Sequence, residues 1–144
     1  MLLVFKGVQH VLPSWTRLTN QTSLYDVSHY IFANLEKNVG YEATSIIISK
    51  DAKHNDRLSC QTNQGDLSYI FSLENKYIYK TTKKATTSGK NPLYVSDCLV
   101  EGWKLSKINN KMLLVELTLR KNNRQETLTK VINCINGSII INES

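Results

Sequence analysis

The chain has 144 residues, of which 41% are hydrophobic and 21% charged, and its formal net charge is +6. A chain of this length buries a core that needs neither a structural metal nor a dense disulfide framework, which excludes the small metal-stapled and disulfide-rich classes. The positive charge favours weak attraction to nucleic acid or anionic lipid, but only Lys83-Lys84 and Arg120-Lys121 are adjacent basic pairs, whereas a dedicated nucleic-acid face usually shows a run or stripe.

The first residues, 1–8, are apolar for only five positions before Lys6. A bilayer span needs about 20 apolar residues, so this segment is too short to cross a membrane by itself. It also lacks the order of charged, apolar and small residues that marks a secretory signal. We interpret it as the last turn of a longer apolar helix.

A helix is predicted beyond Pro13, whose ring restricts the preceding residue and introduces a break or kink. Apolar residues then recur mostly every three or four positions, as on one face of an amphipathic helix. The residues of this stripe are Leu18, Leu24, Val27, Ile31, Leu35 and Val39. Gly40 supplies a C-terminal stop. A helix over 14–39 would be about 39 Å long at ~1.5 Å per residue, and a sheet must cover its apolar face.

The remainder of the chain shows strand patterns. Strands are expected over 44–49, 58–61, 67–73, 77–84, 94–99, 102–108, 111–120 and 127–135, and 139–141 adds an edge strand or packs on the helix. A turn at 74–76 makes a hairpin of two of them and places Tyr69, Phe71 and Leu73 on one face. Polar loops are expected over 50–57 and 86–91.

One helix followed by antiparallel strands is an α+β pattern rather than a series of βαβ units. We therefore predict a single domain over 1–144, in which a long N-terminal helix packs on antiparallel β-sheet. The helical segment covers 1–40, kinked near Pro13, and the β head covers 44–141.

No residue pattern in the chain predicts catalysis. A glycine-rich phosphate-binding motif and a zinc-binding His-Glu-x-x-His helix are both absent from the sequence. His29, Asp26 and Ser28 are interpreted as polar positions on a surface helix. The loop around His54 lacks the spacing of a calcium loop and is interpreted as solvated. We predict that the protein is not an enzyme and uses no cofactor or metal.

The chain has three cysteines, Cys60, Cys98 and Cys134, and none lies in a Cys-x-x-Cys spacing that would support a zinc site. Two interpretations stay open. Cys98 and Cys134 both fall late in the strand region and could form a disulfide, or all three could be buried apolar thiols.

A cluster of tyrosine and lysine predicts an alternative role in binding single-stranded nucleic acid. Tyr77 and Tyr79 would share one strand face beside Lys80, with Lys83 and Lys84 close by, as on a stacking platform. Alternating aromatic residues beside an apolar sheet are also typical of a half-buried core.

The order of motifs from residue 67 onward resembles the head of a minor pseudopilin, in particular the J-type subunit of type II secretion and related type IV pilus-like systems. Leu67-Ser68-Tyr69 and Tyr77-Ile78-Tyr79-Lys80 match the family's hairpin, and Pro92-Leu93 precedes a segment carrying the aromatic Trp103. The family often closes its last strand with Arg-Asn, where this chain has Ile135-Asn136.

The resemblance implies a structural subunit that helps to initiate or cap a pseudopilus by packing, not by catalysis. Its partners would be other minor and major pseudopilins in a hetero-oligomeric tip complex. An apolar N-terminal helix with a methylated first residue would anchor it in the inner membrane, with an extracytoplasmic head. The family's leader, Gly-Phe junction and following glutamate do not occur in this sequence. Contacts are expected on the helix face opposite the sheet and in loops 50–57 and 86–91.

Two other functions remain open from the sequence. One is a DNA-binding minor pilin of a competence or DNA-uptake system, motivated by the net charge and the Tyr77 cluster. The other is an unrelated soluble domain that binds a ligand in an apolar pocket with converging polar groups.

Overall fold

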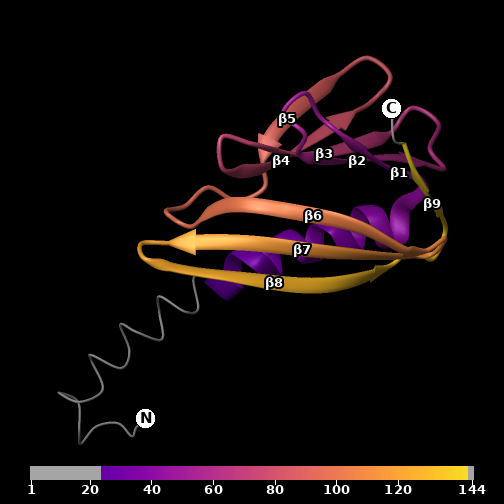
Figure 1. Cartoon of the computed structure of the whole chain (residues 1–144). Helices are drawn as coiled ribbons and strands as arrows, with labels where there is room; N and C mark the ends of the chain where they lie inside the picture. Colours follow the sequence, from indigo (N-terminus) through magenta and orange to yellow (C-terminus); the bar gives the residue numbers. More distant parts are fainter. Residues whose placement is uncertain (1–23, 143–144) are drawn as a thin grey trace, which may run out of the picture.

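The structure is a computed structural model that describes residues 24–142, and Figure 1 traces them through one helix and two β-sheets. Strands account for 58% of these residues and helix for 16%. The predicted α+β fold, with a long helix packed on antiparallel strands, is wrong, because the described helix has 19 residues and two sheets form most of the structure. The predicted kink at Pro13 and residues 14–23 of the predicted helix lie outside the described residues.

The helix runs over residues 24–35 and continues directly into the wider-turned π-helical segment η2 (Glu36–Glu42). The predicted apolar stripe faces inward, and its described members are each at most 2% exposed. These are Leu24, Val27, Ile31, Leu35 and Val39. Burial of each such side chain contributes about 1.5–3 kcal/mol, so this stripe holds the helix on the sheets.

Gly40 does not end the helix as predicted. The helical segment continues to Glu42, and Gly40 is buried inside it. A Cβ at position 40 would lie 3.2 Å from the carbonyl oxygen of Asn133, so the glycine allows the helix to approach a strand end closely.

The larger sheet, called sheet A here, has six strands in the order β5-β4-β3-β2-β1-β9. Its strands are β1 (Ala43–Lys50), β2 (Asp56–Thr62), β3 (Ser68–Glu74), β4 (Tyr77–Lys83), β5 (Ser88–Pro92) and β9 (Ser138–Ile141). Neighbouring strands are antiparallel except β9, which lies parallel to β1. The predicted β3–β4 hairpin is confirmed, and it turns at Asn75 and Lys76, which both have positive φ as a two-residue hairpin turn requires.

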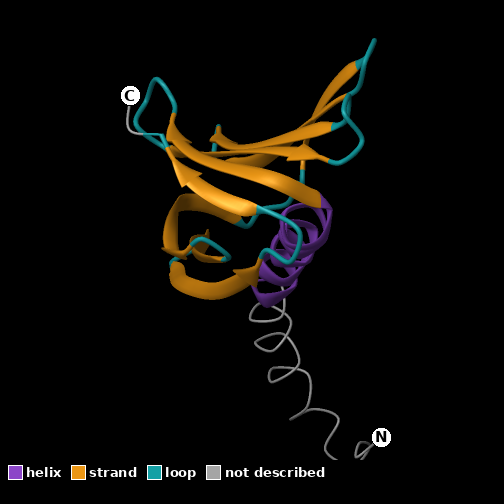
Figure 2. Ribbon diagram, turned by 90° about the vertical axis from the view of Figure 1, so that its right-hand side faces the viewer, coloured by secondary structure: helices purple, strands orange, loops and turns teal. Residues whose placement is uncertain are grey.

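The smaller sheet, sheet B, is an antiparallel meander of β6 (Leu99–Asn109), β7 (Met112–Lys121) and β8 (Arg124–Asn133). The predicted alternation in β7 is confirmed, since Leu113, Val115, Leu117 and Leu119 are fully buried. Sheet B lies below sheet A in Figure 1, and Figure 2 shows the helix at one side of the two sheets. One hydrophobic core joins the helix to the inner faces of both sheets.

Two local predictions were wrong. Segment 86–91, expected to be a loop, contains most of β5, whose polar residues pair with β4 although their side chains give no strand signal. Segment 94–98, expected to be part of a strand, is a connection without strand pairing. Side-chain pattern identifies strands that bury one face, and the exposed edge strand β5 buries none of its first four residues.

Candidate interaction surfaces

The helix exposes tyrosines on the side that faces away from the core. Tyr25 is 47% exposed and Tyr30 is 46% exposed, although both lie next to buried members of the stripe. The ring of Tyr30 packs edge-on against Tyr94, with 5.4 Å between ring centroids, and Val95 beside it is 66% exposed. We call Tyr30, Tyr94 and Val95 the tyrosine patch. Exposed aromatic clusters of this kind are enriched at protein–protein interfaces.

The predicted nucleic-acid residues do not form one platform. Tyr77, Tyr79 and Lys83 lie on the outer face of sheet A, but Lys80 lies on the opposite face, in register with the buried Phe71. The Tyr77 hydroxyl donates to the carbonyl oxygen of Ser96 at 2.8 Å. The ammonium of Lys90 lies over the ring of Tyr79, 5.5 Å from the ring centroid. Lys84 lies beyond the end of β4 and is exposed.

Lys80 belongs to a polar cluster at the end of η2. Its ammonium lies 4.7 Å from the centroid of Tyr69, and burial lowers its pKa. The Glu42 carboxylate accepts hydrogen bonds from Asn38 and from the Tyr69 hydroxyl, both at 2.8 Å. Burial acts to raise the pKa of Glu42, but these two hydrogen bonds and the nearby Lys37 and Lys80 lower it overall.

The same cluster raises the pKa of Tyr69 to about 12, first because the hydroxyl is desolvated and then because it donates to charged Glu42. Asn38 is 1% exposed, and its Oδ1 has no hydrogen-bond partner among the described residues. No residue pattern predicted this cluster, because residues 36–42 follow the helical pattern without marking the π-helical turn. Glu42 is held by the helix end and a strand of sheet A, so the cluster fixes their relative position.

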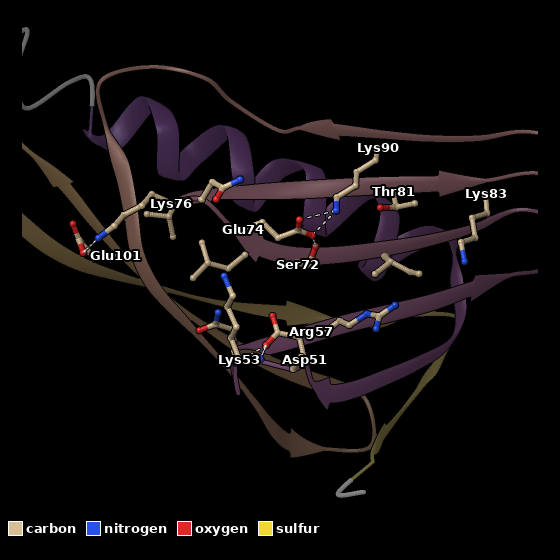
Figure 3. A pocket seen from close by; sticks show the side chains of 16 residues that line it. Asp51, Lys53, Arg57, Ser72, Glu74, Lys76, Thr81, Lys83, Lys90 and Glu101 are labelled. Carbon is tan, nitrogen blue, oxygen red and sulfur yellow. Dashed lines mark hydrogen bonds and ion pairs between the residues drawn. The ribbon is translucent and has the colours of Figure 1, made fainter.

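A hollow on the described surface forms an open basin of about 860 Å³ on sheet A. It lies over the outer face of β2 to β5, and Figure 3 shows the helix behind these strands. Its floor includes Ile70, Ser72 and Thr81, and its rim comes from the 51–55 loop, the β3–β4 turn and β5. The structure therefore brings together residues from both segments, 50–57 and 86–91, in which sequence analysis expected contacts.

The basin carries an excess of positive charge. Five basic residues and three acidic residues line it. Glu74 pairs with Lys90 at 2.6 Å, and Glu101 pairs with Lys76 at 2.7 Å and with Arg120 at 3.2 Å. Hydrogen bonds from these lysines lower the pKa of both glutamates. Both carboxylates are thus already neutralised.

The remaining cations of the basin have no such partner. Asp51 Oδ1 accepts the backbone N–H groups of Lys53 and Asn55, which ties it into its own loop. Among the described residues, no hydrogen bond or ion pair engages the side chains of Lys53, Arg57 and Lys83. Lys53, Arg57 and Lys83 thus lie around the hydroxyl groups of Ser72 and Thr81, as Figure 3 shows, and Ile70 also lines the basin.

All three cysteines are buried free thiols. The pKa of Cys60 is raised to about 12, first by burial and then by the nearby Cys134. Burial also raises the pKa of Cys98 and that of Cys134.

Among the described residues, His, Cys, Asp and Glu side chains do not gather in groups of three or more that could hold a metal ion. Ser28 is buried and donates to the carbonyl oxygen of Tyr25 at 2.8 Å, while Asp26 and His29 are exposed. His54 adopts positive φ in the turn after β1. Asp56, predicted to lie in a solvated loop, is buried at the start of β2.

Comparison with known proteins identifies no relative: no family model matches the chain, and no curated protein or solved structure shows significant similarity to it. Across residues 24–142, no helix combines the length and apolar character that a membrane span requires.

Proposed function

We propose that the chain is a structural subunit of a pilus-like assembly of the pseudopilin type, and that it acts by packing against other subunits. As the sequence resemblance implies, the head would lie outside the cytoplasmic membrane and be anchored through residues ahead of the described helix. Its partners would be other pseudopilins in a tip complex that initiates or caps the filament.

The observation that carries the proposal is the division of the helix into two faces. One face places five apolar side chains in the core, each at most 2% exposed. The other face leaves Tyr25 and Tyr30 about half exposed, and Tyr30 continues into the tyrosine patch on the β5–β6 connection. A helix that is fixed to its own head and still offers aromatic side chains can pack against a neighbouring helix without unfolding.

The two other candidate functions receive less support from the geometry. A stacking platform for single-stranded nucleic acid needs free aromatic faces beside cations, but Lys80 lies on the opposite face from Tyr77 and Tyr79. Lys83 shares their face, yet the Tyr77 hydroxyl donates to Ser96 and the Lys90 ammonium lies over the Tyr79 ring. A ligand carrier needs a concave apolar pocket that buries most of its ligand. The space between the sheets is filled by core side chains, and the hollow on sheet A is an open basin.

Photo-crosslinking in the native cells tests the proposal. A photoreactive phenylalanine analogue replaces Tyr30, and a matched control carries it at Ile108, which is 49% exposed on sheet B. We expect position 30 to crosslink to another subunit with an N-terminal apolar helix, and position 108 to give little of that product. Equal crosslinking from both positions, or an unrelated partner at position 30, would contradict the proposal.

A further inference from the structure

We propose that the basin on sheet A binds an extended acidic segment of a partner protein. The basin and the helix lie on opposite faces of sheet A, as Figure 3 shows, so this binding goes beyond the packing proposed for the helix. Either proposal can therefore fail without the other.

Charge complementarity is the first argument for this occupant. The acidic residues of the basin are neutralised by Lys76, Lys90 and Arg120 or used within their own loop. Lys53, Arg57 and Lys83 remain as cations without a partner among the described residues. Arg57 presents a planar guanidinium that can bind a carboxylate through two parallel hydrogen bonds.

The shape and chemistry of the floor suit a polypeptide. Arg57 is in register with Ser72 on the neighbouring strand, and Ile70 is in register with Thr81. These two adjacent pairs place one cation, two hydroxyl groups and one apolar side chain on the floor. A segment that alternates acidic and apolar side chains could place carboxylates on the rim and an apolar group on Ile70. The outer strand β5 ends at Pro92, which lacks a backbone donor, so binding across the face is favoured over addition of a strand to this edge.

The same surface is a poor match for nucleic acid. A phosphate backbone carries closely spaced charges along its whole length, whereas among the described residues the basin offers it only Lys53, Arg57 and Lys83 as unpaired cations. The Lys90 ammonium lies 5.5 Å from the centroid of the neighbouring Tyr79 ring, where a base would otherwise stack. A peptide can space its carboxylates to meet Arg57 and Lys83.

Fluorescence anisotropy at low salt tests the assignment with three labelled probes. They are a peptide of alternating glutamate and leucine, the same peptide with glutamine in place of glutamate, and an oligo-dT strand of similar length. The test variant is Arg57→Gln with Lys83→Gln. The matched control, Lys104→Gln with Lys107→Gln, removes the same charge from β6, outside the basin.

We expect the glutamate peptide to bind the wild-type protein more tightly than either other probe. The Arg57→Gln/Lys83→Gln variant should weaken that binding by about tenfold or more, and the control should change it by less than about twofold. In the unmodified protein, the glutamate peptide should shift the backbone amide NMR signals of Ile70, Ser72 and Thr81, which makes the result independent of variant folding.

Three results would overturn the proposal. Tighter binding of oligo-dT would assign the basin to nucleic acid. Equal weakening by both double variants would show that only net charge matters. Amide shifts elsewhere, or no shifts at the basin, would place the binding site outside it.

Discussion

Asp56 connects the two sheets through three hydrogen-bonding groups. Its side chain is 5% exposed, and its Oδ2 accepts the backbone N–H of Leu105 on β6 at 2.6 Å. Its other carboxylate oxygen pairs with Lys50, and its backbone carbonyl accepts the indole N–H of Trp103 at 2.9 Å. A β2 residue thus holds β6 in place, although sequence analysis placed Asp56 in a solvated loop.

We expect Asp56→Ala to lower the free energy of unfolding by about 2–3 kcal/mol, because the buried Leu105 N–H loses its acceptor. Asp66→Ala serves as the control, since Asp66 is exposed in the β2–β3 connection and its removal should cost less than about 0.5 kcal/mol. Urea unfolding at neutral pH measures both. Equal effects of the two substitutions would show that Asp56 does not join the sheets.

The hydrogen bond from Tyr69 to Glu42 links β3 to the end of the helix. The pKa of Tyr69 is raised from 10.0 to about 12 in the folded protein. The contribution of Tyr69 to the free energy of unfolding is therefore fully present below pH 10.0 and is lost as the pH rises toward the raised pKa. The pKa of Glu42 is lowered from 4.5 in the folded protein. Its contribution to the free energy of unfolding is therefore present above pH 4.5 and is lost as the pH falls through the lowered pKa.

Tyr69→Phe should therefore destabilise the protein by about 1–2 kcal/mol near neutral pH, where the hydroxyl donates to a charged acceptor. The difference from wild type should stay constant between about pH 6 and pH 9 and shrink above pH 10.0, where wild type begins to lose this contribution. Urea titrations across this range provide the measurement. A difference that persists unchanged well above pH 10.0 would contradict the assigned hydrogen bond.

At the scale of elements, β9 completes sheet A by a parallel pairing with β1. Gly137 precedes β9 and lies against β1, where an added Cβ would be 2.6 Å from the carbonyl oxygen of Ala43. Ile139, which follows, is 1% exposed in the core. The close approach at Gly137 therefore sets the register that buries Ile139.

Gly137→Ala should cost about 1–3 kcal/mol of stability, because backbone atoms on both sides must move apart. Gly65→Ala is the matched control, since a Cβ there meets no atom within 4 Å. Thermal unfolding should show a lower Tm for the Gly137 variant and little change for the Gly65 variant. Unchanged stability of Gly137→Ala would mean that β9 is not packed as described.

The elements that could be predicted are those in which apolar residues recur at the spacing of a helix or a strand. The helix stripe from Leu24 to Val39, the β3–β4 hairpin and the alternation in β7 all bury one face, and the structure buries the predicted residues. The division into two sheets could not be predicted, because the side-chain pattern of a strand does not indicate which other strands pair with it. For example, β9 pairs with β1, which lies far from it in the sequence.

The candidate surfaces were predicted only in part. Loops 50–57 and 86–91 were expected to carry contacts, and residues of both line the basin. Nothing in the sequence indicated that Arg57 and Lys83 would face it together, because β2 and β4 are brought into one face only by β3 between them. Tyr77 and Tyr79 share the outer face of β4 as the strand alternation predicts, and Lys80 lies on the other face beside Tyr69.

At the scale of the whole molecule, two exposed surfaces lie on different sides of one rigid core. The helix carries the tyrosine patch, and the outer face of sheet A carries the basic basin. A subunit of a pilus-like assembly needs contacts on more than one side, because each subunit in a filament meets several neighbours. We therefore propose that sibling subunits pack against the helix and that the acidic partner binds at the basin.

The most direct test of this account is the intact mass and the N-terminal residue of the native protein, isolated from the membrane fraction of its own cells. The account predicts a methylated N-terminal residue and about twenty apolar residues ahead of Leu2, the length that a membrane anchor requires. A native chain that begins at Met1 and is recovered entirely from the soluble fraction would contradict it.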